Sequence, residues 1–504
     1  MTNHLFDGLM PDDRLGDRTC LILADGSSLS HDDVASGTAR HAAALVAVGV
    51  KPGDRVAAQV DKSIEAVFLY IGCVRAGAVF LPLNTAYMPA ELDYFLRDAE
   101  PALVVASPDR RETMEQLAHR TGARVETLGV HGDGTFAALA ASLDASSWKT
   151  VERTPDDLAA ILYTSGTTGR PKGAMLTHGN LRSNAETLVD AWRFTSADVL
   201  IHALPMFHTH GLFVATNVAL LAGAGMVFLP KFNPGEVLDW MSRATVLMGV
   251  PTFYTRLLDD ARLTRETASG MRLFISGSAP LLADTHRAFA ERTGHAILER
   301  YGMTETGMNT SNPFDGERVP GSVGPALKGI SVRVTEPESG APLGTDEIGM
   351  IEVRGPNVLS GYWKKPEATK ESFREDGFFI TGDLGKIDRN GYVWILGRGK
   401  DLVITGGFNV YPKEVELEID ALAGVNESAV IGVPHSDFGE AVVAIVVPEK
   451  GAVPDEAAII ADLRKRLAAY KVPKRIIVVD ELPRNTMAKV QKNLLRERHA
   501  GLFE

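Results

Sequence analysis

Cysteine is nearly absent from this chain, since only Cys20 and Cys73 occur among its 504 residues. Two cysteines exclude a disulfide framework and a four-cysteine zinc site, and their scarcity favours a reducing compartment. The first residues, 1–14, lack a basic region followed by an apolar stretch, so we expect no secretory signal. We therefore predict a cytoplasmic protein in which both cysteines are small buried hydrophobic residues.

Long hydrophobic runs are lacking as well. The most membrane-like segment, residues 214–229, is interrupted by polar residues and glycines and is too short to span a bilayer comfortably. We expect this segment to form a buried helix and a strand. An excess of positive charge is also missing, because the formal net charge is −12. Neither a nucleic acid nor a membrane surface is therefore expected as the main partner.

The remaining composition is that of a globular protein, with 45% hydrophobic and 23% charged residues. A chain of 504 residues is too long for a single core. Through residues 1–399, helical patterns alternate with short β-branched runs, which predicts an α/β domain of parallel or mixed sheets packed with helices. Residues 400–504 differ, because 428–433 and 441–447 look like strands and 455–470 like a helix. This part predicts a small α+β C-terminal domain.

A Gly-rich loop is the first feature with a chemical meaning. Residues 164–173 read TSGTTGRPKG and follow an apolar run, 158–163, that is typical of a buried strand. Such a loop can bring backbone N–H groups close to a phosphate, while its hydroxyls and Lys172 add donors. The Walker A spacing is missing, because Arg170 and Pro171 separate Gly169 from Lys172. A single loop of this kind is more often an ordinary turn, so the interpretation depends on companion motifs.

Four companion motifs follow in order: RYGMTET at 300–306, TGD at 381–383, GRGKD at 397–401 and PRNTMAK at 483–489. In this order and spacing they resemble the adenylate-forming superfamily of AMP-binding enzymes, which includes acyl-CoA synthetases, adenylation domains of peptide synthetases and luciferases. Within it, the chain is most similar to malonyl-CoA synthetases. The resemblance implies that the C-terminal domain is mobile and rotates about a hinge at Lys400/Asp401 between two half-reactions.

The resemblance also implies an ATP site with a bound Mg²⁺. Thr304 would contact the α-phosphate, Glu305 would carry Mg²⁺, and Asp383 and Arg398 would bind the ribose. Outside this context, Asp383 and Arg398 would more often be halves of surface ion pairs. The other residues implied to bind the nucleotide are Thr164, Ser165, Gly166, Thr167, Thr168, Gly169, Lys172, Tyr301, which would stack on adenine, and Gly302.

Lys489 matches the lysine that superfamily members bring to the carboxylate and the α-phosphate. A flexible cation on a mobile domain suits an interaction needed in only one half-reaction. The glycine of the family pattern is missing, because Ala488 stands in its place. If that position requires a positive φ, alanine costs about 1 kcal/mol. A nucleotide-binding protein impaired in catalysis by Ala488 therefore remains an alternative, and the resemblance leaves open a lysine acetyltransferase that acts on Lys489.

The acyl pocket and the thiol path are assigned in the same way. Gly406 and Gly407 look like the segment that lines the tunnel for the pantetheine arm of coenzyme A. Segments 204–211 and 276–280 match the acyl pocket, and the resemblance places His208, which would also assist catalysis, His210, Ser278 and Met303 there. Arg287 would pair with the second carboxylate of malonate. The helical spacing of Arg287 and Glu291 alone favours a solvated arginine that pairs with this glutamate.

The predicted activity is that of an ATP-dependent acid–thiol ligase. It would convert malonate, or methylmalonate, to malonyl-CoA through malonyl-AMP, releasing AMP and pyrophosphate. The alternative within this chemistry is an acyl-CoA synthetase for a short or aromatic monocarboxylate. The run His208-Thr209-His210 could suggest zinc, but no third ligand is evident in the sequence.

Overall fold

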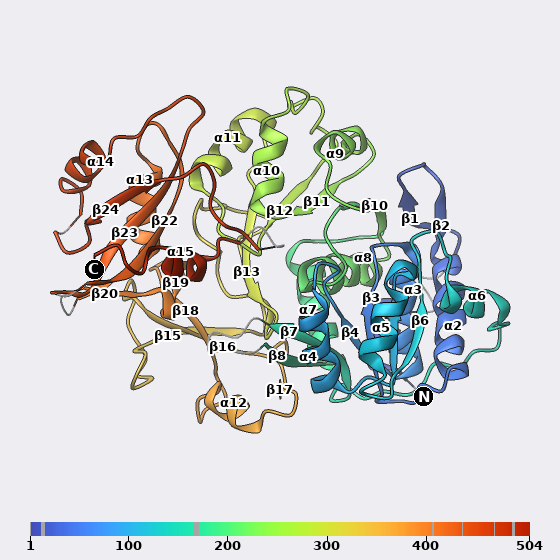
Figure 1. The fold of residues 1–504 in the computed structure, drawn as a ribbon. Helices are drawn as coiled ribbons and strands as arrows, with labels where there is room; N and C mark the ends of the chain where they lie inside the picture. Colours follow the sequence, from blue (N-terminus) through green and yellow to red (C-terminus); the bar gives the residue numbers. More distant parts are fainter. Residues whose placement is uncertain are drawn as a thin grey trace. The chain divides into compact units, whose positions relative to one another are not determined.

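The computed structural model describes residues 2–11, 16–164, 171–405, 408–435, 437–467, 469–485 and 489–503. The chain divides into two compact units (Figure 1). Unit 1 comprises Met1–Ser331 and Val353–Phe379, and unit 2 comprises Val332–Glu352 and Ile380–Glu504. Unit 2 therefore contains residues 332–352 and 380–399 in addition to the predicted C-terminal domain, 400–504. The predicted division into 1–399 and 400–504 concerns motion, and it stays a prediction, as does the hinge at Lys400/Asp401.

An eight-stranded sheet forms one half of unit 1. Its order is β14-β13-β12-β11-β9-β10-β1-β2, with parallel pairs from β13 to β1 and antiparallel strands at both edges. The strands are β1 (Thr19–Leu23), β2 (Ser28–Ser30), β9 (Val199–His202), β10 (Gly225–Phe228), β11 (Val246–Gly249), β12 (Leu273–Ser276), β13 (Leu298–Met303) and β14 (Gly307–Ser311). β9, β11 and β12 are short apolar runs, as expected for strands buried on both faces.

A seven-stranded sheet forms the other half, in the order β17-β8-β7-β4-β3-β5-β6. The pairs from β7 to β6 are parallel, whereas β8 and β17 run antiparallel to their neighbours. The strands are β3 (Arg55–Gln59), β4 (Val79–Pro82), β5 (Leu103–Ala106), β6 (Arg124–Thr127), β7 (Leu158–Thr164), β8 (Lys172–Thr177) and β17 (Gly361–Tyr362). The sequence prediction of an α/β unit with parallel and mixed sheets is confirmed.

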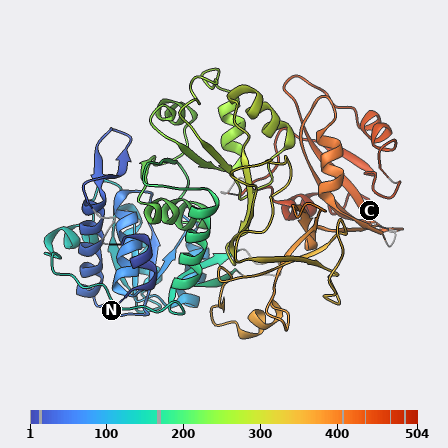
Figure 2. The same ribbon diagram turned by 180° about the vertical axis from the view of Figure 1, so that it is seen from behind.

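Helices cover the sheets of unit 1. Leu92, Phe95 and Met114 from two helices share one core with Leu81 and Val104 of the seven-stranded sheet. Figure 2, seen from behind, shows further blue helices in front of the opposite face of that sheet. The helices are α1 (His4–Leu9), α2 (His31–Ala47), α3 (Ile64–Ala76), α4 (Pro89–Ala99), α5 (Arg111–Ala118), α6 (Thr135–Ser142), α7 (His178–Ala191), α8 (Asn217–Ala222), α9 (Pro234–Met241), α10 (Pro251–Leu258), α11 (Ala283–Thr293) and α12 (Pro366–Glu371).

Local sequence explains where these helices begin and end. The Ser63 side chain accepts a hydrogen bond from the Ala66 N–H at the start of α3, and Gly77 ends the helix with a φ of 69°. Serine at the first cap and glycine in the left-handed conformation at the last are the preferred terminators. Helix α3 and the strand β4 that follows it are one instance of the alternation of helices and β-branched runs predicted for residues 1–399.

The segment 214–229 is buried, as predicted. Its first part belongs to a π-helix, η3 (His210–Thr216), which continues into α8 and then into β10. Over the described parts of the chain, the structure contains no helix with the length and apolarity needed to cross a bilayer. The predicted cytoplasmic location stays a prediction.

Unit 2 contains a four-stranded and a five-stranded sheet. The four-stranded sheet has the order β15-β16-β18-β19, with β15 (Ser331–Thr335), β16 (Gly349–Arg354), β18 (Phe379–Ile387) and β19 (Val393–Arg398). The other has the order β21-β20-β23-β22, and β24 also pairs with β23. Its strands are β20 (Val403–Thr405), β21 (Phe408–Val410), β22 (Val425–His435), β23 (Gly439–Pro448) and β24 (Arg475–Val478).

Alternating residues of β22 and β23 pack on opposite faces of the five-stranded sheet. Val430 and Val442 share a core with α13 (Pro412–Asp420) and α14 (Glu456–Leu463). Ile431 and Val443 pack with Leu495 of α15 (Lys492–His499). The predicted small α+β domain is confirmed, but the predicted helix over 455–470 was too long. Asp455 caps α14 at its start, and the helix gives way to turns after Leu463.

Candidate active site, in two parts

The β7–β8 hairpin holds the two ends of the Gly-rich loop. Thr164 pairs with Lys172 across the hairpin, and the Thr164 hydroxyl donates to the Lys172 carbonyl at 3.5 Å. The predicted phosphate-binding residues between these ends, Ser165, Gly166, Thr167, Thr168 and Gly169, lie outside the described residues. The Lys172 amine lies 5.0 Å from the centre of the Tyr362 ring. The hairpin therefore places this cation beside β17.

Tyr362 links the lysine to the predicted metal-binding carboxylate. Its hydroxyl donates to Glu305 Oε1 at 3.2 Å, and Glu305 is only 7% exposed. The backbone also connects the two segments, because the Leu359 N–H donates to the Glu305 carbonyl at 2.7 Å. Sequence reasoning missed Tyr362. Only the pairing of β17 with β8 brings it to this place, and no local pattern announces that pairing.

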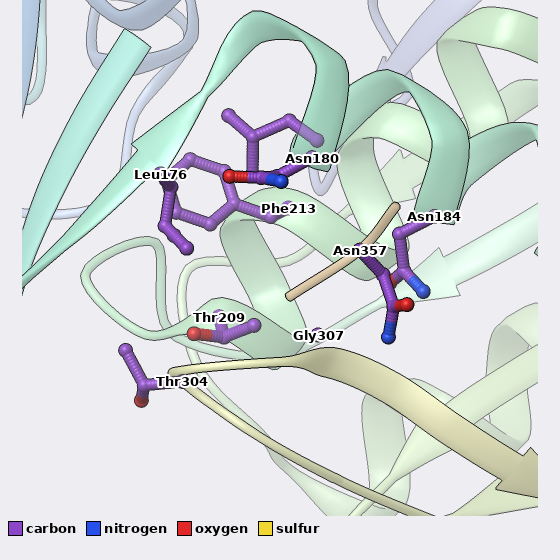
Figure 3. A pocket seen from close by; sticks show the side chains of 9 residues that line it. Leu176, Asn180, Asn184, Thr209, Phe213, Thr304, Gly307 and Asn357 are labelled. Carbon is purple, nitrogen blue, oxygen red and sulfur yellow. The ribbon is translucent and has the colours of Figure 1, made fainter. Parts of the chain in front are cut away.

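Thr304 lies beside the predicted acyl segment. Thr304 and Thr209 line one small cavity of about 10 Å³, together with Asn184 and Asn357, and Figure 3 shows the two threonines near each other. A cavity of this volume has room for about one water molecule. The Oγ1 of Thr209 and the Oδ1 of Asn357 have no hydrogen-bond partner among the described residues.

Tyr301, Gly302 and Met303 end strand β13, whose partner is β14. Tyr301 is half-buried, and its hydroxyl contacts the Met303 sulfur at 4.0 Å. A Cβ added to Gly302 would lie 2.8 Å from the Met308 Cα, so this glycine permits the close approach of the two strands. The predicted contacts of Tyr301 and Gly302 with a nucleotide, and of Met303 with the acyl group, stay predictions.

The two predicted acyl-pocket segments meet at His210 and Ser278. His210 Nδ1 lies 3.2 Å from Ser278 Oγ, and His210 is 1% exposed. Ser278 has a φ of 73°, a conformation that non-glycine residues adopt mainly where function demands it. The His210 pKa is held well below its ordinary value, first by burial and then by Arg300 and His208. His210 is therefore neutral at physiological pH.

His208 belongs to the first of these segments, 204–211. It is half-buried, and its Nδ1 accepts a hydrogen bond from the His210 backbone N–H at 3.5 Å. The structure thus brings together three of the predicted acyl-pocket residues, namely His208, His210 and Ser278. Among the residues that the structure describes, no group of three metal-ligating side chains gathers around them.

Arg300 is a buried cation that sequence reasoning passed over. It is 3% exposed, and its Nε and Nη2 have no partner among the described residues. The guanidinium packs against Gly277, where an added Cβ would lie 2.6 Å from Arg300 Nε. Burial lowers the Arg300 pKa to about 9, so the group is still charged at neutral pH. A buried charge without a partner is costly, which points to an anionic ligand at this place.

Arg287, the arginine that the sequence favoured for this role, lies elsewhere. It projects from α11 with a side chain that is 59% exposed, and it pairs with Asp284. The partner is thus the aspartate one turn before it rather than Glu291. The structure does not bury Arg287 beside His210, and its place in the acyl pocket stays a prediction.

The second part of the candidate site lies in unit 2. Asp383 of β18 and Arg398 of β19 are cross-strand partners, with Oδ1 and Nε 2.8 Å apart. Asp383 is 4% exposed, and Arg398 also donates to the Thr381 carbonyl at 3.1 Å. The two residues predicted to bind ribose thus stand side by side. Their contact with a ribose stays a prediction.

Lys489 belongs to the same part of unit 2. Its backbone N–H donates to Asn485 Oδ1 at 3.0 Å, and the residue is exposed over much of its surface. Protein atoms around the amine, and then the Arg398 charge, lower its pKa, whereas Asp383 and Asp401 raise it. Lys489 is therefore close enough to the Asp383–Arg398 pair to feel both charges. Gly406, Gly407 and Ala488 lie outside the described residues.

Asp401, one of the two predicted hinge residues, is tied to the helix that follows Lys489. The Arg496 guanidinium of α15 pairs with Asp401 at 2.8 Å, and the Asp401 side chain is 14% exposed. Lys400 and Asp401 form the end of a 3₁₀ turn, η4 (Gly399–Asp401). This ion pair connects the predicted hinge to the segment that carries the predicted catalytic lysine.

Comparisons with known proteins agree with this geometry. The family model for AMP-binding enzymes matches residues 12–363, and the model for the AMP-binding enzyme C-terminal domain matches residues 414–489. The crystal structure of ATP-bound MatB from Rhodopseudomonas palustris is 62% identical, with a TM-score of 0.98 over 100% of both chains. A malonate–CoA ligase from Arabidopsis thaliana is 35% identical over 94% of this chain and 85% of its own. A feruloyl-CoA synthase from an Amycolatopsis species is 37% identical over 96% of this chain and 97% of its own.

Proposed function

Because the chain belongs to the family of AMP-binding enzymes, we propose that it is an ATP-dependent acid–thiol ligase that converts malonate to malonyl-CoA. The first half-reaction joins malonate to the AMP portion of ATP and releases pyrophosphate. The second transfers the malonyl group from malonyl-AMP to the thiol of coenzyme A and releases AMP. The similarity to a malonate–CoA ligase and to an ATP-binding protein over nearly the whole chain supports both the acid and the nucleotide.

In the first half-reaction, a malonate carboxylate oxygen attacks the α-phosphorus, and negative charge accumulates on phosphoryl oxygens. The chain contributes position and donors rather than a nucleophile. Thr304 donates to the α-phosphate, and Lys172 approaches the outer phosphates from the hairpin. A single buried carboxylate, Glu305, held by Tyr362, suits Mg²⁺, which when bound with phosphate oxygens would neutralise their charge.

The buried guanidinium of Arg300 is the main support for malonate as the substrate. Nε and Nη2 of this guanidinium have no partner among the residues that the structure describes, and the second carboxylate of malonate is a planar acceptor of opposite charge. We propose Arg300 for this role in place of the exposed Arg287. Neutral His210 and the Ser278 hydroxyl lie beside it and complete a polar pocket for a short dicarboxylate.

The same charge disfavours monocarboxylates. An acetate or an aromatic acid would leave the buried guanidinium unpaired, at a cost of about 3–5 kcal/mol. That cost corresponds to a preference for malonate of about a hundredfold or more. Methylmalonate keeps the second carboxylate and adds one methyl group, so it remains a candidate substrate.

Lys489 and the segment from Lys400 to Gly407 serve the change between half-reactions. Lys489 neutralises the carboxylate and α-phosphate during adenylation, and rotation about Lys400/Asp401 then brings Gly406 and Gly407 to the pantetheine arm of coenzyme A. A lysine acetyltransferase acting on Lys489 would remove the charge that adenylation needs. Asp383 and Arg398 bind the ribose hydroxyls of the nucleotide.

A substrate panel tests the proposal directly. Pyrophosphate release is measured with ATP, Mg²⁺ and malonate, methylmalonate, acetate, butyrate or ferulate, and the nucleotide product is identified after addition of coenzyme A. We expect AMP, and kcat/KM for malonate at least a hundredfold above every monocarboxylate. Formation of ADP would indicate a kinase instead. Comparable rates with ferulate would favour a monocarboxylate ligase.

The choice between the two arginines is tested with R300Q and R287Q. We expect R300Q to lower kcat/KM for malonate by about a hundredfold and to narrow the preference over butyrate, whereas R287Q changes both by less than about threefold. The opposite ranking would return the role to Arg287. Thermal unfolding of both variants checks that the loss reflects the pocket rather than the fold.

A further inference from the structure

A buried amine, that of Lys62, contacts His202 close to the 204–211 segment and takes no part in the chemistry described above. Its amine donates to the His202 carbonyl at 2.7 Å and lies 2.9 Å from His202 Nδ1. It also lies 4.4 Å from the centre of the Phe228 ring. Lys62 directly precedes the Ser63 cap of α3, while His202 ends β9. The contact therefore joins the two sheets of unit 1.

The surroundings of His202 determine which ring nitrogen carries its proton. His202 is fully buried, and its Nε2 lies 3.0 Å from the Gly211 carbonyl, which can only accept a hydrogen bond. Nε2 also lies 3.2 Å from the Thr216 hydroxyl, whose hydrogen is donated to the same carbonyl. The Gly211 carbonyl therefore favours a hydrogen on Nε2, which leaves Nδ1 to accept one. Lys62 supplies that donor. The opposite tautomer would set the Nε2 lone pair against the Gly211 oxygen.

The Gly211 carbonyl belongs to the unusual turn that carries His210. Gly211 lies in the π-helix η3, and the Thr216 hydroxyl also donates to its carbonyl at 2.9 Å. π-helical turns are rare and occur mostly at functional sites. A Cβ on Gly211 would lie 3.0 Å from the Pro205 carbonyl carbon. The start of the π-helix is therefore tightly packed against Pro205 of the same segment. Side-chain donors to this carbonyl therefore stabilise a backbone that is otherwise disfavoured.

We propose that Lys62 is a positioning residue of the acyl pocket, which holds His202 as the Nε2–H tautomer so that His202 fixes the π-helical turn presenting His210 to the carboxylate substrate. The inference rests on the proposed function in so far as His210 lines the acyl pocket. Lys62 itself touches neither His210 nor Ser278 in the contacts of the structure. Burial lowers its pKa well below the ordinary lysine value, as expected for an amine enclosed by protein.

The kinetic test uses K62M, which keeps the length of the side chain and removes its donor. We expect KM for malonate to rise about tenfold, while KM for ATP and kcat change by less than about twofold. The matched control is K51M, at an exposed lysine, which should leave all three constants unchanged. A lower melting temperature with an unchanged KM for malonate would mean that Lys62 is only structural, and would overturn the proposal.

Two substitutions of His202 distinguish the effect of losing the Nε2–H donor from the effect of losing the imidazole ring. The amide of Gln reaches about as far as Nε2, so H202Q retains a donor for Gly211 without needing Lys62, whereas H202N does not. We expect H202N to raise KM for malonate as much as K62M, and H202Q to raise it by less than about threefold. Adding K62M to H202Q should have little further effect, because the two residues act through one hydrogen bond. Equal losses in H202N and H202Q would contradict the proposal even if K62M did not fold.

Nitrogen NMR of the protein labelled with ¹⁵N-histidine reads the tautomer without any substrate. The His202 signals are assigned by their loss in H202Q. We expect an Nε2–H imidazole in the unmodified chain and a mixture of tautomers in K62M. An Nε2–H imidazole in both proteins would overturn the role of Lys62. Absence of pyrophosphate release with malonate would instead refute the proposed function and leave the NMR result to judge the tautomer.

Discussion

Gly277 and Arg300 occupy complementary positions, because the Arg300 guanidinium fills the space that a side chain on Gly277 would need. The Gly277 N–H also donates to the Gly249 carbonyl at 3.3 Å, which holds this backbone at the end of β12. Gly277 therefore leaves room for the buried guanidinium of Arg300.

The substitution G277A should displace the guanidinium without straining the backbone. We expect kcat/KM for malonate to fall by at least about tenfold, because Arg300 can no longer meet the second carboxylate in the same geometry. The control is G270A, where the nearest atom to an added Cβ is 3.6 Å away. Steady-state kinetics with malonate and butyrate measure the effect. An unchanged preference for malonate over butyrate in G277A would contradict the role of Arg300.

The substitution Y362F should weaken the hold on Glu305. The hydroxyl donates to the carboxylate at 3.2 Å, and loss of a partner that orients a metal-binding carboxylate typically lowers metal affinity by about tenfold or more. We expect the Mg²⁺ concentration for half-maximal activity to rise about tenfold, with KM for malonate unchanged. Titration of activity against Mg²⁺ measures this. Equal effects on both constants would indicate a general distortion.

The substitution K489A should slow adenylation and leave thioester formation nearly unchanged. We expect pyrophosphate release to fall by about a hundredfold or more, because a charge that stabilises the adenylation transition state is lost. Thioester formation from synthetic malonyl-AMP and coenzyme A should change by less than about threefold. K465A, at an exposed lysine in the same unit, is the control. Similar losses in both half-reactions would show that Lys489 does not act in adenylation alone.

The substitution A488G tests the departure from the family pattern. If the backbone before Lys489 requires a positive φ, glycine removes about 1 kcal/mol of strain, which corresponds to about fivefold faster adenylation. Single-turnover formation of malonyl-AMP gives the rate. An unchanged rate would mean that alanine is tolerated there, and would remove the reason to consider an impaired enzyme.

Buried His178 should make the fold sensitive to acid. Burial first, and then Arg153, lowers its pKa to about 4 from the ordinary value of 6.5. The unfolded chain therefore binds more protons between these values, so stability is lost as the pH falls from about 6.5 to about 4. By pH 4 the loss from this residue is about 3 kcal/mol.

Urea unfolding of H178L between pH 7 and pH 4 measures this contribution. We expect a shallower loss of unfolding free energy than in the unmodified chain, by up to about 3 kcal/mol across the range. H131L, at an exposed histidine, should follow the unmodified chain. Parallel curves for H178L and the unmodified chain would show that His178 does not carry the effect.

Local patterns predicted those features that depend on neighbours in the sequence. The apolar run before Thr164 became β7, the segment from Ser63 became α3, and the alternating strands of the C-terminal part became β22 and β23. The helix over 455–470 was predicted too long, since apolar spacing does not mark where a helix must give way to turns. Motif order identified the family, because several short motifs in one sequence order seldom occur together by chance.

Long-range packing decided what those patterns could not. The sequence favoured Arg287 for the pocket and gave no sign of Arg300, yet Arg287 projects from α11 with an exposed side chain and Arg300 is buried at β13. Tyr362 reaches Glu305 only because β17 pairs with β8, and Lys62 reaches His202 only because the fold brings the start of α3 to the end of β9.

The sequence by itself therefore determined the secondary structure, the family and the set of candidate groups. The tertiary structure decided which candidates are buried and which charges lack partners. The physical reason is that the propensity of a segment depends on residues a few positions apart, whereas burial and pairing depend on contacts between residues far apart in the chain.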